Sequence, residues 1–120
     1  PQFLDGLHGL GLAYAAQGKI AEAEAQFRAV LRQSPDCAEA YTHLGKLYAS
    51  TGRLDEAIAA YRRVITVEPN RAQGYHNLGA VLAAKGLVEA AAEQFEEALD
   101  RDPVDHLKIS ILIYFILRKT

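Results

Sequence analysis

Four histidines are the residues of this chain best suited to hold a metal ion. His8, His43, His76 and His106 recur at nearly even intervals along the chain. Imidazole nitrogens are common zinc ligands, so a stack of imidazoles is one way to build a metal site. However, no carboxylate or cysteine recurs beside them, and no two histidines have the four-residue spacing that places two ligands on one helix face. We therefore expect solvent-facing histidines and no bound metal or cofactor.

Other catalytic arrangements are missing from the sequence as well. It contains no glycine-rich phosphate loop and no set of serine, histidine and aspartate at a recognisable spacing. Its glutamates are distributed as helix-surface charges, several of them beside Arg or Lys. We expect no enzyme activity in this chain.

The net charge, the length of the apolar segment and the cysteine content exclude further classes of function. The formal net charge is −2, so the chain has no basic footprint with which to bind nucleic acid. Its most apolar segment, at the C-terminus, is shorter than the ~20 residues of a membrane span. Cys37 is the only cysteine and cannot form an internal disulfide, which gives weak support for a cytoplasmic location.

The histidines and the other side chains named above are carried by a repeat in the sequence. The four prolines are evenly spaced, at Pro1, Pro35, Pro69 and Pro103. Other columns keep the same period: a Leu-Gly pair, a turn glycine, an alanine and an aromatic residue. These columns are Leu10-Gly11, Leu44-Gly45 and Leu78-Gly79; Gly18, Gly52 and Gly86; Ala23, Ala57 and Ala91; and Phe27, Tyr61 and Phe95. Such self-similarity predicts an array of stacked units.

The repeat resembles the tetratricopeptide repeat, whose unit combines these columns at a period of about 34 residues. The resemblance covers residues 4–103 and implies an all-α, right-handed superhelical solenoid of antiparallel helix pairs. The expected units of this single domain, 1–120, are repeats at about 4–37, 38–71 and 72–105 and a terminal or capping helix at 106–118. Because Pro1 occupies the closing column of a repeat, we also expect the chain to be a fragment of a longer array.

The spacing of apolar residues predicts two amphipathic helices in each repeat. The predicted helices are residues 4–17, 20–33, 38–50, 54–67, 72–84, 88–101 and 106–118. A turn glycine follows the first helix of each repeat, where a left-handed residue ends a helix at little cost. Gly45 and its equivalents lie inside a helix, so we expect close approach to Ala57 on the facing helix, with Tyr61 filling the seam to the next repeat. Asp36 and Asn70 are candidate N-caps.

The C-terminal segment is unusually apolar for an end unit. Nine of the twelve residues from His106 to Leu117 are apolar, whereas an end repeat normally presents a polar face. One interpretation is that this segment packs on the third repeat through Ile109, Leu112 and Ile116 and covers a missing helix with its other side. The alternative is a self-association or partner surface that would form a homo-oligomer. The residues of that surface are Ile111, Tyr114, Phe115 and Leu117.

The family resemblance also implies where a protein or peptide partner would bind. In tetratricopeptide arrays the first helices of successive repeats line a concave groove that takes an extended peptide or a helix. The matching groove residues here are Asp5, His8, Leu12, Glu39, Thr42, His43, Lys46, Gln73, His76, Asn77 and Ala80.

The matching positions do not form the carboxylate clamp that chaperone-binding members use. That clamp requires several converging cations, and the positions hold His8, Leu12, His43, Gln73 and Asn77 instead. The asparagine ladder of sugar-transferring members is matched by Asn77 alone. We expect a nearly neutral groove that holds its ligand by backbone hydrogen bonds and apolar contacts.

Together these features favour a non-enzymatic protein-interaction module that acts as a scaffold or adaptor. Two alternatives stay open. The first is self-assembly through the apolar C-terminal helix, and the second is a targeting array for an enzyme whose catalytic domain lies outside this chain.

Overall fold

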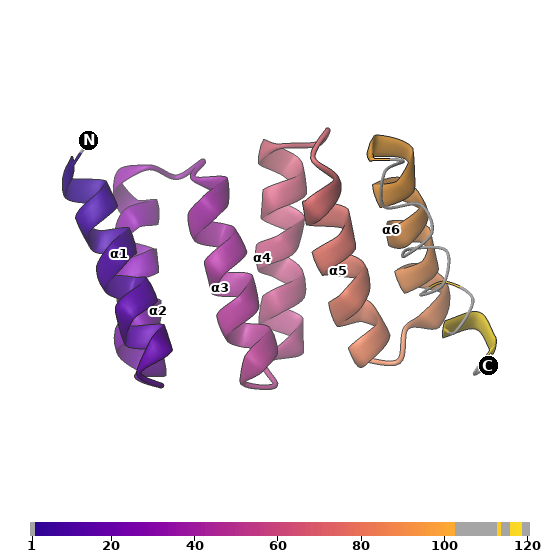
Figure 1. The fold of residues 1–120 in the computed structure, drawn as a ribbon, viewed down its shortest axis with the longest axis horizontal. Coiled ribbons are helices and arrows are strands. Elements are labelled where there is room, and N and C mark those ends of the chain that lie inside the picture. The colour runs from indigo at the N-terminus through magenta and orange to yellow at the C-terminus, as the bar shows by residue number, and fades with distance from the viewer. Residues whose placement is uncertain (1, 103–112, 114–115, 119–120) are drawn as a thin grey trace.

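The computed structural model describes residues 2–102, 113 and 116–118 and shows a row of antiparallel helix pairs (Figure 1). The six helices within residues 2–102 are α1 (Gln2–Ala16), α2 (Ile20–Gln33), α3 (Ala38–Ser50), α4 (Leu54–Val67), α5 (Ala72–Ala84) and α6 (Val88–Arg101). The described part of the chain contains no strand, and the described residues of the C-terminal segment, 113 and 116–118, are helical. The predicted all-α solenoid is therefore confirmed.

Three glycines end the first helix of each pair, as the sequence predicts. Gly18, Gly52 and Gly86 have φ angles of 77°, 79° and 89°, which is the left-handed region. After each glycine the chain donates a hydrogen bond back into the helix, for example from the Arg53 N–H to the Tyr48 carbonyl at 2.8 Å. This is the pattern of a Schellman cap, and it turns the chain so that the second helix packs back on the first.

An aromatic ring from the second helix covers the interior glycine of its own repeat. A Cβ placed on Gly45 would lie 2.5 Å from a ring carbon of Tyr61, and Gly11 and Gly79 meet Phe27 and Phe95 in the same way at 2.8 Å. The atoms nearest to that Cβ belong to the ring of Tyr61, whereas the sequence predicts a close approach to Ala57. The aromatic column also reaches the next repeat, as predicted for Phe27, which stacks on His43 with ring centroids 5.6 Å apart.

The predicted N-caps are wrong by one residue. Helices α3 and α5 begin after Cys37 and Arg71, and neither of these residues forms a side-chain capping bond. The residues between α2 and α3 form a turn in which the Cys37 N–H donates to the Ser34 carbonyl at 3.1 Å. Asp36 therefore lies within the turn, before the helix starts.

The C-terminal segment is described only in part. Ile113 and Ile116 are partly buried and pack against the core, as expected for Ile116, whereas Leu117 is 46% exposed. Ile109, Ile111, Leu112, Tyr114 and Phe115, with His106, lie outside the described residues. None of the helices among the described residues has the length and apolarity needed to cross a membrane.

Candidate functional site

The first helices α1, α3 and α5 form one face of the molecule, which we call the first-helix face. Helix α3 is its centre, and a hollow lies on each side of it. The N-terminal hollow, between α1 and α3, has a volume of about 270 Å³ and is lined by Leu12, Ala15, Ile20, Phe27, His43, Lys46, Leu47 and Ser50. The C-terminal hollow, between α3 and α5, has a volume of about 330 Å³ and is lined by Glu39, Thr42, His43, Lys46, Arg71 and Gln73.

More than half of the predicted groove residues line these two hollows. They are Leu12, Glu39, Thr42, His43, Lys46 and Gln73. Ala15 and Ser50, two small residues of the first helices, also line the N-terminal hollow. His43 and Lys46 border both hollows, so a ligand that crossed α3 would pass over these two side chains.

The other predicted residues lie outside both hollows. Asp5 and Ala80 are exposed on α1 and α5. His76 packs beside Phe95, with ring centroids 5.6 Å apart. The side-chain carbonyl of Asn77 accepts a hydrogen bond from the Gln73 amide at 2.9 Å, so this amide pair occupies the α5 side of the face.

Two histidines pack on one phenylalanine at the junction between the first and second repeats. The ring centroids of His8 and His43 are 4.8 Å apart, and they lie 5.5 and 5.6 Å from that of Phe27. The His8 side chain is only 12% exposed. The expectation of a solvent-facing imidazole is therefore wrong for His8, because the ring that covers Gly11 also gives it an apolar surface to pack on. His43 is partly buried on the same ring but still borders both hollows.

Burial governs the charge state of His43. It lowers the pKa of this imidazole below its usual range, and the nearby His8 and Lys46 add to the effect while Glu39 opposes it. His43 is thus a neutral donor and acceptor at neutral pH, which suits a polar contact to a peptide backbone.

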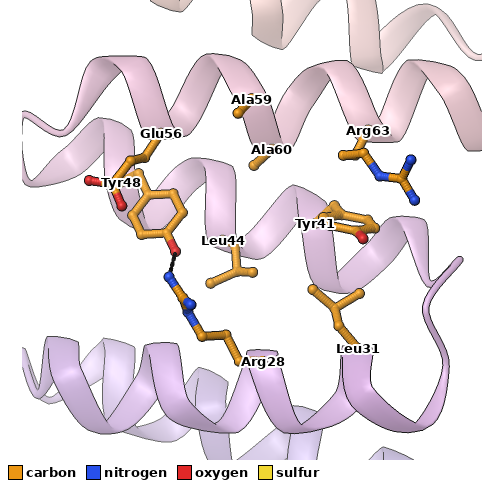
Figure 2. A pocket seen from close by; sticks show the side chains of 9 residues that line it. All are labelled: Arg28, Leu31, Tyr41, Leu44, Tyr48, Glu56, Ala59, Ala60 and Arg63. Atoms are coloured by element: carbon orange, nitrogen blue, oxygen red, sulfur yellow. Dashed lines mark hydrogen bonds between the residues drawn. The ribbon is translucent and has the colours of Figure 1, made fainter.

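Sequence reasoning missed a third hollow, which lies between α2, α3 and α4 (Figure 2). Most of its lining residues belong to the second helices α2 and α4, so we call this side of the molecule the second-helix face. This hollow has a volume of about 330 Å³ and is lined by Arg28, Leu31, Tyr41, Leu44, Tyr48, Glu56, Ala59, Ala60 and Arg63. The Arg28 guanidinium donates to the Tyr48 hydroxyl at 3.1 Å and closes one end of it.

Glu24 organises the polar groups at that end. Its carboxylate accepts hydrogen bonds from the Tyr48 hydroxyl at 2.8 Å and from the Arg53 guanidinium at 2.9 Å. The hydrogen bond from Arg53 is the largest of the influences that hold the pKa of Glu24 at about 2. The sequence gives little indication of this contact, because Glu24 and Arg53 lie in different repeats and do not occupy equivalent positions of the repeat.

Comparisons with known proteins agree with the observed architecture. A family model described as tetratricopeptide repeat matches residues 8–75 and 58–106. No curated protein sequence matches the chain. Among solved structures, a mutant O-GlcNAc transferase from Thermobaculum terrenum is 28% identical with a TM-score of 0.81, and the match covers 98% of this chain but 22% of that one.

Two further solved structures match over nearly their whole length. The type III secretion chaperone SycD of Yersinia enterocolitica, in complex with a peptide of the translocator YopD, is 20% identical with a TM-score of 0.89, and the match covers 100% of this chain and 97% of that one. The TPR2B domain of yeast Sti1, in a complex with pHsp70, is 18% identical with a TM-score of 0.89 over 100% of both chains. At this identity they show a shared fold. With the family model matching most of the sequence, the chain belongs to the tetratricopeptide repeat family.

Proposed function

We propose that this chain is a non-enzymatic interaction module that binds a peptide segment of a partner protein on its first-helix face. Tetratricopeptide repeats are generally interaction modules, and SycD was solved with a peptide bound. The observation that carries the proposal is the pair of hollows on either side of α3, which share His43 and Lys46. Two adjoining hollows suit successive side chains of one extended segment.

The chemistry of this face favours a peptide held by its backbone and by apolar side chains. The N-terminal hollow presents Leu12, Leu47 and Phe27, which suit an apolar side chain. The C-terminal hollow presents Thr42 and Gln73 beside two cations, of which Arg71 is already paired with Glu68 at 2.9 Å. Among the described residues, Lys46 is then the one cation bordering both hollows, and a carboxylate clamp, which needs several converging cations, does not fit this set.

A peptide library gives a direct test. Peptides selected on the untagged chain from a random display library would be synthesised, and their Kd measured by fluorescence anisotropy. A variant with His43→Ala, Lys46→Ala and Gln73→Ala removes three polar side chains that line the two hollows. Because each contact contributes about 1 kcal/mol, the Kd should rise by roughly 100-fold.

The control variant carries three truncations on exposed positions of the second helices: Arg32→Ala, Arg62→Ala and Glu96→Ala. It should bind the selected peptides as the wild type does. An equal loss of affinity in both variants, or a library that yields no binding peptide, would refute the proposal.

Self-association is a second candidate function, favoured by exposed apolar side chains at both ends of the array. Phe3 at the start of α1 is 60% exposed and Leu117 is 46% exposed. Stacking of one copy's first repeat on another copy's C-terminal segment would cover both. Light scattering should then show a concentration-dependent mass that Leu117→Glu abolishes, and a monomeric wild type at all concentrations would exclude this role.

A targeting role for a catalytic domain is a third candidate. It is favoured by the match to the O-GlcNAc transferase, of which this chain spans 22%. A gene that encodes a catalytic domain in one chain with these repeats would support this role, and a gene that encodes the repeats alone would exclude it.

A further inference from the structure

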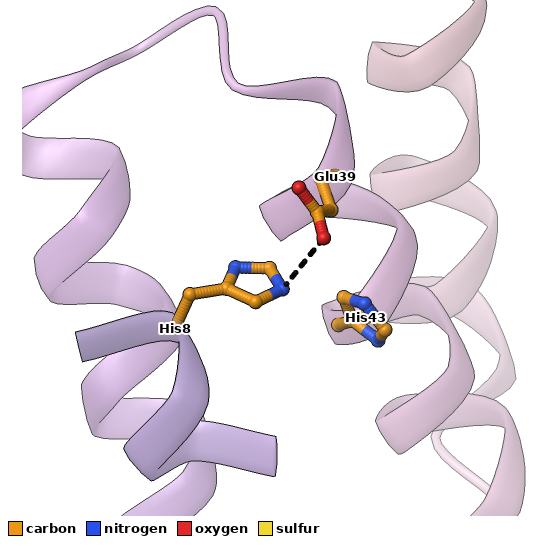
Figure 3. A group of neighbouring side chains, drawn as sticks. All are labelled: His8, Glu39 and His43. Carbon is orange, nitrogen blue, oxygen red and sulfur yellow. Dashed lines mark ion pairs between the residues drawn. The ribbon is translucent and has the colours of Figure 1, made fainter. Parts of the chain in front are cut away.

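Three side chains from two neighbouring repeats converge on the first-helix face (Figure 3). His8 belongs to α1, and Glu39 and His43 belong to α3. Each offers one nitrogen or oxygen atom, and these three atoms all lie within 4.8 Å of one another. Glu39 and His43 are one helical turn apart in sequence, so the helix itself holds them on one face. We propose that this group is a zinc site that joins the first repeat to the second.

The distance between His8 and Glu39 already matches a zinc site. Nε2 of His8 lies 3.3 Å from Oε1 of Glu39. Two ligand atoms at bonds of about 2.0–2.1 Å in a tetrahedral site are separated by about 3.3 Å. One edge of the coordination tetrahedron is thus preformed. The His43 nitrogen lies within 4.8 Å of the other two ligand atoms, so it has to move closer by at most about 1.5 Å to complete the site.

The second observation is an unsatisfied nitrogen. Nε2 of His8 is buried from solvent and has no hydrogen-bond partner among the described residues, since the Glu39 carboxylate is close but not aligned for a hydrogen bond. Buried polar atoms without a partner are rare and need an explanation. A metal ion between the imidazole and the carboxylate supplies the missing partner of Nε2 and neutralises the charge of Glu39.

The ligand set selects the class of metal. Two imidazoles and one carboxylate suit zinc, whereas Mg²⁺ and Ca²⁺ prefer oxygen ligands alone. Three protein ligands leave the fourth position of a tetrahedral zinc ion for water or for a side chain of a bound partner. Lys46 is the nearby cation and limits the affinity, while Glu39 supplies the compensating negative charge.

The next junction, between the second and third repeats, lacks these ligands. In the next repeat, the residues one period after His8, Glu39 and His43 are Thr42, Gln73 and Asn77. None of these three side chains is a good zinc ligand. Glu39 does not recur with the histidines at the repeat period, so the sequence does not mark it as a ligand. It precedes His43 by one helical turn and lies beside His8 only after the repeats stack.

Zinc titration of the full chain by isothermal calorimetry tests the proposal. The chain is untagged, is freed of metal by chelation, and carries Cys37→Ser to remove the only thiol. One equivalent of Zn²⁺ should bind, and His8→Gln and His43→Gln should each weaken the affinity at least about 100-fold, because each removes one of three ligands. His76→Gln is the matched control, since His76 follows Thr42 by one repeat period in the column of His8, and it should bind zinc as the parent does.

Thermal unfolding guards against variants that merely fail to fold. Zinc should raise the Tm of the parent and of His76→Gln, and leave the Tm of folded His8→Gln and His43→Gln unchanged, because a ligand stabilises only a protein that binds it. Circular dichroism establishes that the variants are folded. Failure of the parent to bind one equivalent, or an equal loss in His76→Gln, would overturn the zinc site. Either outcome would leave the peptide-binding proposal standing, because peptide binding is measured separately in metal-free buffer.

Discussion

The two junctions between the three repeats are built from different chemistry. At the first, Glu24 accepts hydrogen bonds from Tyr48 and Arg53 across the repeat boundary. At the second, the residues one repeat period later are Ile58, Leu82 and Leu87. Ile58 and Leu82 are buried in the core cluster. One helical scaffold therefore tolerates either a charged network or an apolar contact at the same place.

The same contrast holds on the first-helix face. The first junction presents two imidazoles packed on Phe27, with Glu39 beside them. The matching side of α5 presents the amide pair of Gln73 and Asn77. The largely buried ionisable groups Glu24 and His8 thus lie at the first junction, whereas the ion pair of Lys85 with Asp55 across the second is exposed. Acid and metal ions should therefore act more strongly on the first junction than on the second.

The largest expected effect comes from placing a charge at the apolar junction. Ile58→Glu should lower the free energy of unfolding by about 3–4 kcal/mol, because a buried side chain is lost and a carboxylate is placed in the apolar core cluster that contains Leu82. Urea unfolding followed by circular dichroism measures this loss. Ile58→Val is the control and should cost about 1 kcal/mol. Equal stability of the two variants would mean that the second junction is not an apolar core.

A smaller effect is expected from neutralising the acid at the polar junction. Glu24→Gln should lower the free energy of unfolding by about 1–2 kcal/mol at pH 7, since charge-assisted bonds to Arg53 and Tyr48 become neutral ones and Arg53 is partly solvent-screened. The exposed Glu93 provides the control variant, Glu93→Gln, whose cost should be close to zero.

The pH dependence of this loss has a definite sign. The Glu24 carboxyl has a pKa of about 2 in the folded chain against an ordinary value of 4.5, so the unfolded chain binds the proton more readily. Its contribution is fully present above about pH 5 and fades as the pH falls towards 2. Wild type and Glu24→Gln should converge in stability over that window. A difference that stays constant down to pH 2 would contradict the assignment.

The smallest effects come from two tyrosine hydroxyls, one at each junction. Tyr48 donates to Glu24 at 2.8 Å, and Tyr75 donates to the Pro69 carbonyl at 2.7 Å. Tyr48→Phe and Tyr75→Phe should each cost about 1 kcal/mol at pH 7. Only the loss in Tyr48→Phe should shrink in acid, because its partner becomes protonated. Urea unfolding at pH 7 and at about pH 2 measures the two losses. If both losses shrank equally in acid, the proposed contrast between the two junctions would be wrong.

The fold could be predicted because the same residue pattern occurs in every repeat. The turn glycines, the helix-interior glycines and the aromatic residues each recur three times in the sequence, so chance agreement is small. Contacts between repeats could not be predicted in this way. His8 meets His43, and Glu24 meets Arg53, at separations that differ from the period, and only the stacking of the helices brings these pairs together. The prediction of Asp36 as an N-cap was wrong because the turn before α3 extends to Cys37.

The most direct test of the central proposal is a map of the surface that a selected peptide contacts. Backbone amide chemical shifts of the isotope-labelled chain would be recorded with and without the peptide. We expect the changes to concentrate in α3 around His43 and Lys46, in α1 around Leu12 and at the start of α5. Changes concentrated instead around Arg28, Tyr41 and Arg63 would place binding on the second-helix face and contradict the account.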